Sequence, residues 1–525
     1  MTSWIGRAAG IGLLLAAASP SVRAQELKIG VAALSTSVDP HFYNLAANVT
    51  LSLHIFDRLT QRAPNSSLMP ALALSWRPAA DTVWEFKLRP GVTWSDGTAF
   101  TAEDVAFTVD RARNVPNSPS SFAGFLRAIK TVEVVDPLTV RFHTERPAPN
   151  VPIDLATIAI VSRHSGQGAT TDDYNTGRAA IGTGPYRLVK FDRGSAVALE
   201  RNPSWWGPKP EWEKVGFRGM PNAAARIAAL LAGDVDLIDS PPLSDLQRLK
   251  DDKRVAVFEA QGLRVIFLGP DHLRETEPPF MTDNDGRPLP RNPMRDLRVR
   301  LALSIAINRQ GLVDQVMQGA ATPTGQWMPA GTPGYLPDSP PPKYDPARAR
   351  QLLADAGYPQ GFRLTLHAPN DRYPNDAAVA QAVAQMWTRI GVATKVEILP
   401  GAVYSPRGVR HEYAMGLWGW SNNTAEAGSG LVNMLGTEDA KLGRGVSNVA
   451  GYANPALDAL TETALSTLDD GKRAALFRQA TQMVTDDVAL ITLFHLMNPW
   501  AGRAGLTYQA RADEQTYAVD VRSGK

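Results

Sequence analysis

The chain has 525 residues and a formal net charge of +2, from 54 basic and 52 acidic side chains. Its hydrophobic content of 44% and charged content of 20% are typical of a globular protein and exclude a disordered tail or a fibrous repeat. A net charge close to zero gives little electrostatic support to nucleic-acid binding. The absence of cysteine excludes disulfides, thiolate metal sites and a cysteine nucleophile.

The first 24 residues have the pattern of a secretory signal peptide. Arg7 provides the positive start, residues 8–18 are apolar, and Ser19-Pro20 breaks the helix before Val22-Arg23-Ala24. A single-pass anchor is the alternative, which the pattern disfavours because a run of about a dozen residues is too short to span a bilayer. Cleavage before Gln25 leaves a formally neutral chain of 501 residues, expected to diffuse freely in a periplasm and, without cysteine, not to be a lipoprotein.

The first half of the chain predicts alternating strands and helices. Alternating polar and apolar residues predict strands, and Thr101 with Asp104 is close to a capping box at a helix start. The expected elements are strands at 26–33 and 82–88, a helix after Thr101, a hairpin of 132–135 with 139–142, a helix at 222–231 and a strand at 235–238.

The second half continues the mixed α/β pattern. The expected elements are helices at 296–307 and after Asp345-Pro346, a strand at 362–367, a helix at 377–390, strands at 394–399 and 414–418, a helix at 472–486 and a strand at 489–494. Residues 362–399 thus predict a βαβ unit, whose connecting loops lie at a cleft.

Motifs of catalysis are missing from the sequence. There is no G-x-S-x-G elbow and no P-loop, and His411-Glu412 lacks the second histidine of a metalloprotease helix. Gly182-Thr183-Gly184 has no third glycine and is followed by Pro185, which does not suit a dinucleotide. We therefore expect a binding protein with no enzymatic activity, no cofactor and no metal ligands.

Several motifs in chain order resemble one known family. They are Ser37–His41 (SVDPH), His54–Leu59 (HIFDRL), Trp84–Thr98 (WEFKLRPGVTWSDGT) with Thr101–Val105, Gly182–Tyr186, Arg201–Pro203 with Trp205-Trp206, and Val299–Leu303 with Ala306–Arg309. The resemblance extends over nearly the whole chain after residue 24. The sequence resembles the bacterial extracellular solute-binding proteins of the peptide/nickel family, which serve ABC importers.

The resemblance implies an α/β fold with two lobes that close on a solute, the type II or Venus-flytrap fold of periplasmic binding proteins. An extra domain is expected to be inserted in the first lobe. We expect the first lobe to comprise 25–65, 180–265 and 490–525, the inserted domain 66–179 and the second lobe 266–489. Two crossings, near residues 265 and 490, would then permit hinge closure.

The resemblance also implies a carboxylate-binding arginine. In dipeptide-binding relatives, an arginine followed shortly by a tyrosine grips the peptide carboxylate from the loop after a strand. Arg372 and Tyr373 occupy that place, and the guanidinium fork suits a carboxylate because it donates two parallel hydrogen bonds. The alternative is that Arg372 pairs with Asp371 or Asp376 on the surface.

A second predicted element is the segment LWGWSNN, residues 417–423. Relatives carry a similar strand end followed by an aspartate for the α-ammonium, and Asn423 or Asn422 stands there instead. An amide brings no full charge, so Glu426 is a candidate substitute anion. Trp418 and Trp420 are predicted either to wall the pocket or to pack in the core.

Weaker candidates lie in the first lobe and the inserted domain. Thr36, Ser37, Asp39 and His41 lie near the expected edge of the first lobe, and Phe122 lies in a loop that would cover the ligand. Each of them has a structural role as its alternative.

Three functions stay open from the sequence. The first is a monomeric periplasmic binding protein that delivers a peptide or a peptide-like carboxylate to ABC permease subunits. The second keeps the fold but binds an opine, a modified sugar or a metal chelate, because of the departure at Asn423. The third, a secreted hydrolase, is disfavoured by the missing nucleophile and base.

Overall fold

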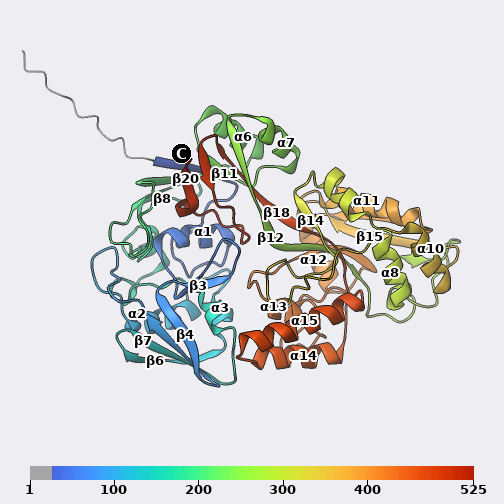
Figure 1. Ribbon diagram of the computed structural model, residues 1–525, viewed down its shortest axis with the longest axis horizontal. Coiled ribbons are helices and arrows are strands. Elements are labelled where there is room, and N and C mark those ends of the chain that lie inside the picture. Colours follow the sequence, from blue (N-terminus) through green and yellow to red (C-terminus); the bar gives the residue numbers. More distant parts are fainter. Residues whose placement is uncertain (1–25, 525) are drawn as a thin grey trace, which may run out of the picture.

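The computed structural model describes residues 26–524, so the predicted signal segment lies outside the described residues. Figure 1 shows two lobes side by side, with the blue and cyan parts of the chain in one and the yellow and orange parts in the other. The long strands β12 (Val255–Pro270) and β18 (Ile491–Arg503) run between them. No helix in residues 26–524 has the length and apolar character needed to cross a membrane.

One sheet of twelve strands passes through both lobes. Its main order is β13 (Met281–Thr282), β15 (Phe362–Pro369), β17 (Met415–Ser421), β12, β18, β11 (Leu237–Asp239), β1 (Glu26–Val31), β10 (Lys214–Gly219), β9 (Ala196–Arg201) and β8 (Tyr186–Asp192). In addition, β14 (Ala321–Pro323) pairs with β18, and β16 (Val392–Leu399) pairs with β15. The sheet is continuous between the lobes because β12 and β18 pair antiparallel on both sides of the junction.

The register of these two strands changes between the lobes. Gln261 lies opposite Met497, but the next pair is Val265 with His495, so β12 advances four residues where β18 advances two. Extra residues on one strand disrupt the ladder and bend the strand. Arg264 lies in this irregular stretch, at the point where the chain passes from one lobe to the other.

In the first lobe, helices pack against both faces of the sheet and bury its apolar side chains. Leu27 and Ile29 of β1 are fully buried. The Asn222 side chain accepts the Ala225 N–H at 2.9 Å at the start of α6, and Gly233 ends that helix with a φ of 81°. The helices here are α1 (Ala46–Ile55), α6 (Ala223–Ala232) and α7 (Leu243–Asp251).

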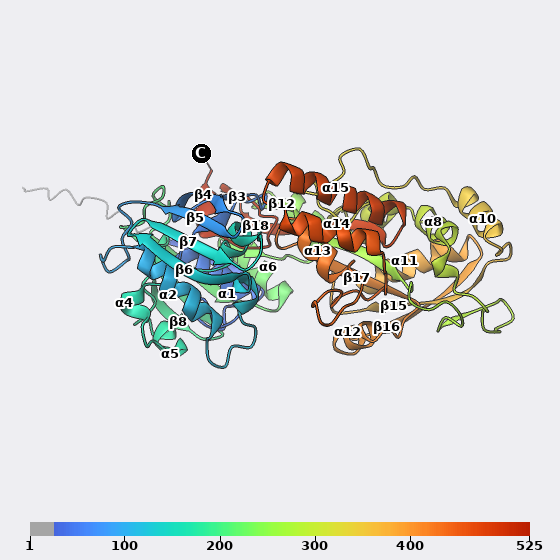
Figure 2. The same ribbon diagram turned by 90° about the horizontal axis from the view of Figure 1, so that it is seen from below.

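A separate four-stranded antiparallel sheet lies on the first lobe (Figure 2), away from β15 and β16 of the second. Its order is β4 (Ala73–Ala80), β5 (Val83–Leu88), β7 (Thr139–Thr144) and β6 (Ile129–Asp136). Phe86 and Phe142 meet edge to face in its core at 5.1 Å. The α2 helix (Ala102–Arg113) packs on this core, and Asp104 accepts the Thr101 N–H at 2.9 Å.

Short elements connect the four-stranded sheet to the first lobe, and others form the C-terminal end of the described chain. They are β2 (Thr60–Arg62), β3 (Leu68–Pro70), η1 (Ala123–Leu126), α3 (Val151–Leu155), α4 (Arg163–Gly166), α5 (Thr171–Asn175), β19 (Leu506–Tyr508), η4 (Ala518–Asp520) and β20 (Val521–Ser523).

The second lobe contains the βαβ unit. β15 and β16 are parallel neighbours, and α11 (Asp376–Thr388) connects them. The Trp387 indole of α11 is buried and donates to the Leu303 carbonyl at 2.9 Å, which fixes α11 against α8 (Leu297–Ile305). The other elements on this side are η2 (Pro293–Arg295), α9 (Arg309–Gly311), η3 (Leu312–Val316), α10 (Pro346–Asp355) and α12 (Gly401–Val409).

A layer of helices covers the second lobe near the four-stranded sheet (Figure 1). It consists of α13 (Gly428–Asn433), α14 (Pro455–Ser466) and α15 (Asp470–Asp486). Its core contains the fully buried side chains of Trp327, Leu431 and Phe477.

Most elements expected from the sequence are confirmed, with ends shifted by a few residues. The strand at 26–33 is β1, the hairpin around Asp136-Pro137 is β6 with β7, and the βαβ unit is β15–α11–β16. The presence of β12 and α14 and the length of β18 were not expected. The strand expected at 489–494 continues to Arg503 and so carries the chain into the other lobe.

Candidate functional site

Two neighbouring cavities lie where residues of the two lobes meet, and we call them together the cleft. The larger, of about 530 Å³, is bordered by Arg372 on the second-lobe side and Ser240 on the first-lobe side. The smaller, of about 300 Å³, is bordered by Asn423 on one side and Tyr517 on the other. Arg372 and Tyr373 thus both border the larger cavity, and Asn423, but not Asn422, borders the smaller one.

The loop after β15 places Arg372 at the larger cavity. The Asp376 carboxylate accepts the backbone N–H groups of Arg372 and Tyr373, both at 3.1 Å, and Asn375 has a left-handed φ of 55°. The Arg372 side chain is exposed, and its guanidinium lies 5.3 Å above the Tyr373 ring. Within residues 26–524 it makes no ion pair, so Asp376 fixes the backbone of the loop and leaves the guanidinium free for a ligand.

Tyr373 joins this loop to the segment 417–423. Its hydroxyl accepts the Gly419 N–H at 2.9 Å and lies 3.4 Å from the Gly419 carbonyl. Burial raises the pKa of Tyr373 above its ordinary value of 10.0, so the hydroxyl keeps its proton at neutral pH. The two predicted elements are therefore neighbours, brought together by one side chain.

Trp418 and Trp420 flank Gly419 but pack away from the cleft. Both lie against the core cluster under α13–α15, and neither borders the two cavities. The Trp418 ring lies 4.5 Å from the Tyr404 ring, and a methyl group added at Gly408 would overlap it. Packing explains their positions.

The two asparagines at the end of β17 differ in environment. Asn422 is fully buried, donates its amide to the Met328 sulfur at 3.4 Å and does not border the cleft. Asn423 is exposed, borders the smaller cavity and accepts the Ser421 hydroxyl at 2.7 Å. The Glu426 carboxylate is buried in an ion pair with Arg473 at 2.7 Å, so it is not available to a solute in the cleft.

The weaker candidates lie together, but not at the cleft. The Asp39 carboxylate accepts two bonds from Arg111, at 2.9 and 2.8 Å, and His41 binds Arg111 and the Ala159 carbonyl through its two ring nitrogens. The Ser37 hydroxyl donates to Asn175 at 2.9 Å. Phe122 is buried in the core of the four-stranded sheet, with its ring edge to face with that of His41 at 6.1 Å.

Through these contacts, residues 37–41 connect the first lobe to the inserted part of the chain. Burial and the Arg111 charge lower the pKa of His41 to about 4, so the ring is neutral there. Thr36 borders a separate hollow of about 960 Å³, which is lined only by residues between 34 and 194. That hollow contains no second-lobe residue.

Sequence reasoning missed the charged residues that both cavities share. Arg264 and Glu514 border the larger and the smaller cavity alike. Their side chains approach to 3.8 Å, between the Arg264 guanidinium and the Glu514 carboxylate. A lone arginine before the apolar run VIFLG and an acidic pair in a polar turn were the signals available in the sequence.

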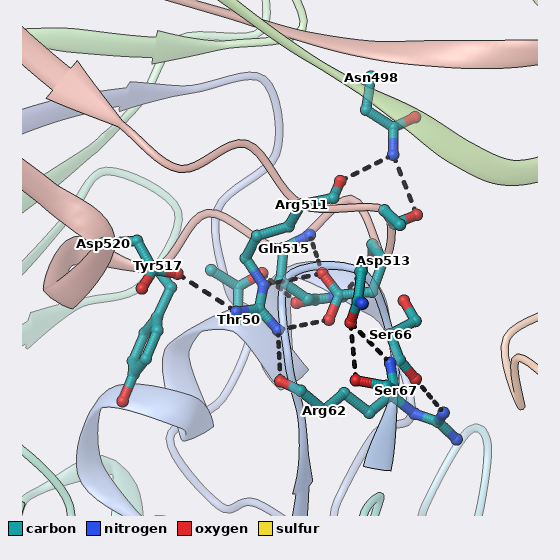
Figure 3. Close-up of polar contacts among 12 residues, drawn as sticks. Thr50, Arg62, Ser66, Ser67, Asn498, Arg511, Asp513, Gln515, Tyr517 and Asp520 are labelled. Carbon is teal, nitrogen blue, oxygen red and sulfur yellow. Dashed lines mark hydrogen bonds and ion pairs between the residues drawn. The ribbon is translucent and has the colours of Figure 1, made fainter. Parts of the chain in front are cut away.

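The loop that carries Glu514 is fixed by a polar network (Figure 3). The buried Arg511 guanidinium donates to the Asp513 carboxylate at 3.0 and 2.8 Å and to the Arg62 carbonyl at 3.0 Å. The Asn498 amide of β18 donates to the carbonyls of Arg511 and Ala512, both at 3.1 Å. The C-terminal loop is therefore tied both to the strand between the lobes and to β2.

Arg62 also makes a contact across the cleft. Its guanidinium donates to the Thr424 carbonyl of the second lobe at 2.9 Å. Asp154 lies nearby at the smaller cavity, where burial raises its pKa to about 8 despite the Arg62 charge. The cleft is thus lined by more guanidinium groups than carboxylates, and the carboxyl group of Asp154 is neutral at neutral pH.

The fold and the cleft define a class of protein: two-lobed α/β binding proteins of the Venus-flytrap kind, with an extra domain inserted in the first lobe. No group of histidine, aspartate or glutamate in residues 26–524 is placed to hold a metal ion. The chain belongs to a family described as bacterial extracellular solute-binding proteins, family 5, whose middle-region model matches residues 67–441. It is a solute-binding protein, and the resemblance seen in its motifs is confirmed.

Curated and solved relatives agree with this membership. The chain is 26% identical over 514 residues to the dipeptide-binding protein of Escherichia coli, covering 93% of this chain and 92% of that one. It is 28% identical over 478 residues to heme-binding protein A of Haemophilus influenzae, covering 85% and 82%. The solved structure of HbpA2 from Haemophilus parasuis superposes with a TM-score of 0.82 at 24% identity, covering 95% and 100%, and shows the shared fold.

Proposed function

We propose that this chain captures a peptide, or a peptide-like solute with a carboxylate, between its two lobes and delivers it to the permease subunits of an ABC importer in the inner membrane. The observation that carries this proposal is the exposed Arg372 guanidinium at the larger cavity, free of any ion pair in residues 26–524. A guanidinium fork binds a carboxylate through two charge-assisted hydrogen bonds. The similarity to a dipeptide-binding protein supports the same ligand class.

The mechanism we propose is closure of the lobes on the solute. A ligand that contacts both lobes stabilises the closed arrangement because its contacts are complete only there. In this scheme, Arg372 and Tyr373 hold the solute from the second lobe and Asn423 borders its far end. The solute leaves chemically unchanged.

The proposed setting is the periplasm. The pattern of residues 1–24 supports export through a cleaved signal peptide, and the absence of cysteine supports a chain without a lipid anchor. In this proposal the protein acts as a monomer. We also propose that the chain is divided into a first lobe (25–65, 180–265 and 490–525), an inserted domain (66–179) and a second lobe (266–489).

A thermal-shift screen with dipeptides and tripeptides tests the function. A ligand that binds the folded state stabilises it by about 2.7 kcal/mol at 100 times its Kd, so binding raises Tm in a concentration-dependent way. We expect saturable 1:1 binding without turnover. A chain that responds to opines, modified sugars or metal chelates, but to no peptide, contradicts the proposal.

Arg372→Ala tests the site. Loss of a hydrogen-bonded charge pair costs about 1.5–3 kcal/mol, so affinity should fall roughly 10- to 100-fold. Arg348→Ala, which removes an exposed arginine on α10, is the matched control and should bind like the wild type. Equal affinity of Arg372→Ala and the wild type shows that the carboxylate binds elsewhere.

A further inference from the structure

We propose that Glu514 binds the cationic end of the solute, so that the cleft selects a zwitterion rather than a simple anion. This inference rests on the proposed function and adds the residue that recognises the ligand's ammonium group. Glu514 thus takes the role of ammonium ligand, for which the sequence left Asn423 and Glu426 as candidates.

Glu514 lies where the cavities converge. It borders the cavities of about 530 and 300 Å³ that form the cleft, and a third of about 180 Å³ beside the end of β1. Among the described residues, it is the one shared by all three. Its side chain is 45% exposed, so it is open to a solute from more than one side.

The backbone at Glu514 is held in a conformation that costs energy. Its φ is 64°, in the left-handed region that non-glycine residues rarely adopt. The Asp513 carboxylate accepts the Gln515 N–H at 3.2 Å, and Arg511 holds Asp513 in place. The network in Figure 3 thus fixes the loop on both sides of Glu514 and directs this residue to the cleft.

The other carboxyl groups around the three cavities are already engaged. Asp513 is paired with Arg511, and Asp239 accepts the Ala32 N–H at 2.7 Å. Asp154 is neutral at neutral pH because burial raises its pKa to about 8. Among residues 26–524, the one ionic partner of Glu514 is the Arg264 guanidinium at 3.8 Å, longer than a charge-assisted hydrogen bond.

The charges across the larger cavity suit a zwitterion. Arg264 and Arg372 border this cavity together with Glu514, its one carboxylate in the described chain. Without solute, Arg264 and Glu514 partly neutralise each other. A zwitterion exchanges that contact for two, because its carboxylate meets the guanidiniums and its ammonium meets Glu514.

The test compares each dipeptide that shifts the wild-type Tm with its N-acetylated derivative, which lacks the ammonium. By calorimetry, the wild type should prefer the free amine at least tenfold. Glu514→Gln keeps the size of the side chain but removes its charge, and should lose this preference while binding the acetylated peptide within about twofold of the wild type. Glu145→Gln, a surface carboxylate that pairs with Lys130 at 3.4 Å, is the control and should keep the preference.

The outcomes separate this inference from the proposed function. A Glu514→Gln variant that still prefers the free amine tenfold overturns the role of Glu514, although peptide binding stands. If no peptide binds the wild type, the proposed function fails first. Circular dichroism and an unchanged Tm without ligand establish that Glu514→Gln is folded, so a lost preference cannot come from unfolding.

Discussion

The Tyr373 hydroxyl accepts the Gly419 N–H at 2.9 Å, which joins the loop after β15 to the strand β17. The contact depends on the missing side chain at position 419. A methyl group there would lie 2.8 Å from the Tyr373 ring and 2.9 Å from the Ile266 side chain, closer than atoms normally approach. Gly419 therefore sets the position of the tyrosine next to Arg372.

Gly419→Ala should displace Tyr373 and weaken ligand binding. Overpacking of this kind costs about 1–3 kcal/mol, so Tm should fall moderately while the chain remains folded. The affinity for the solute should fall more than Tm alone suggests, because Arg372 moves with the loop. Calorimetry and thermal melts measure both effects.

Gly124→Ala is the matched control for that variant. A methyl group added at Gly124 meets no other atom within 4 Å, and its φ lies outside the left-handed region. Binding and Tm should both be unchanged. Wild-type affinity in Gly419→Ala would show that the position of Tyr373 does not govern the site.

Arg511→Gln should destabilise the protein strongly. The Arg511 guanidinium is buried between Asp513 and Asp520, at 2.8 and 3.2 Å, so its removal leaves two carboxyl groups without their charge partner. Breaking a buried charge pair by removing one member costs about 3–5 kcal/mol. Urea unfolding measures the loss.

A surface arginine with similar geometry is the control for Arg511. Arg254 pairs with Asp252 at 2.7 Å, but its side chain is exposed. Arg254→Gln should leave the unfolding midpoint nearly unchanged, since exposed ion pairs contribute little. Equal effects of the two substitutions would contradict the structural role given to Arg511.

Asp154→Asn should stabilise the protein at alkaline pH. Burial raises the pKa of Asp154 from 3.8 to about 8, so the folded state holds a proton that the unfolded state releases between these values. Wild-type stability from this group is therefore lost as pH rises from about 4 to 8. The gain from asparagine should reach a few kcal/mol, in order of magnitude, at pH 9 and vanish near pH 4. If the free energies of unfolding of variant and wild type change in parallel with pH, the raised pKa of Asp154 is refuted.

His54→Gln should have the opposite pH dependence. Burial lowers the pKa of His54 from 6.5 to about 4, so unfolding takes up a proton between these values. Stability from the neutral ring is present above pH 6.5 and lost as pH falls towards 4. The wild type should thus lose up to about 3 kcal/mol more than the variant over this window. Thermal melts of the variant and the wild type at pH 7 and at pH 4.5 measure this difference in stability.

The sequence was most informative where local rules decide the structure. The Thr101 to Asp104 cap, the Asp345-Pro346 helix start and the alternating strand at 82–88 each depend on neighbours within a few residues. Neighbouring residues carry enough information to place these features. Arg372 and Tyr373, in contrast, were predicted from the resemblance to dipeptide-binding relatives, and they lie in the loop after β15.

The remaining parts of the cleft depend on contacts between distant segments. Arg264 and Glu514 are 250 positions apart, and no local pattern relates them. Trp418, in turn, resembles a pocket residue in the sequence but is packed against Tyr404. Only the folded chain shows which polar side chain meets which partner, and hence which carboxylate remains free.

The pairing of β12 with β18 on both sides of the lobe junction restricts how the molecule can move. Two separate tethers would let the lobes twist, slide and swing independently. Two hydrogen-bonded strands act as a ribbon: it resists stretching and in-plane shear and flexes most easily across its flat face, at the level where Gln261 and Val265 break the register. The lobes should therefore open and shut along one main path, and a residue inserted in either strand there should change the angle of opening before it changes the fold.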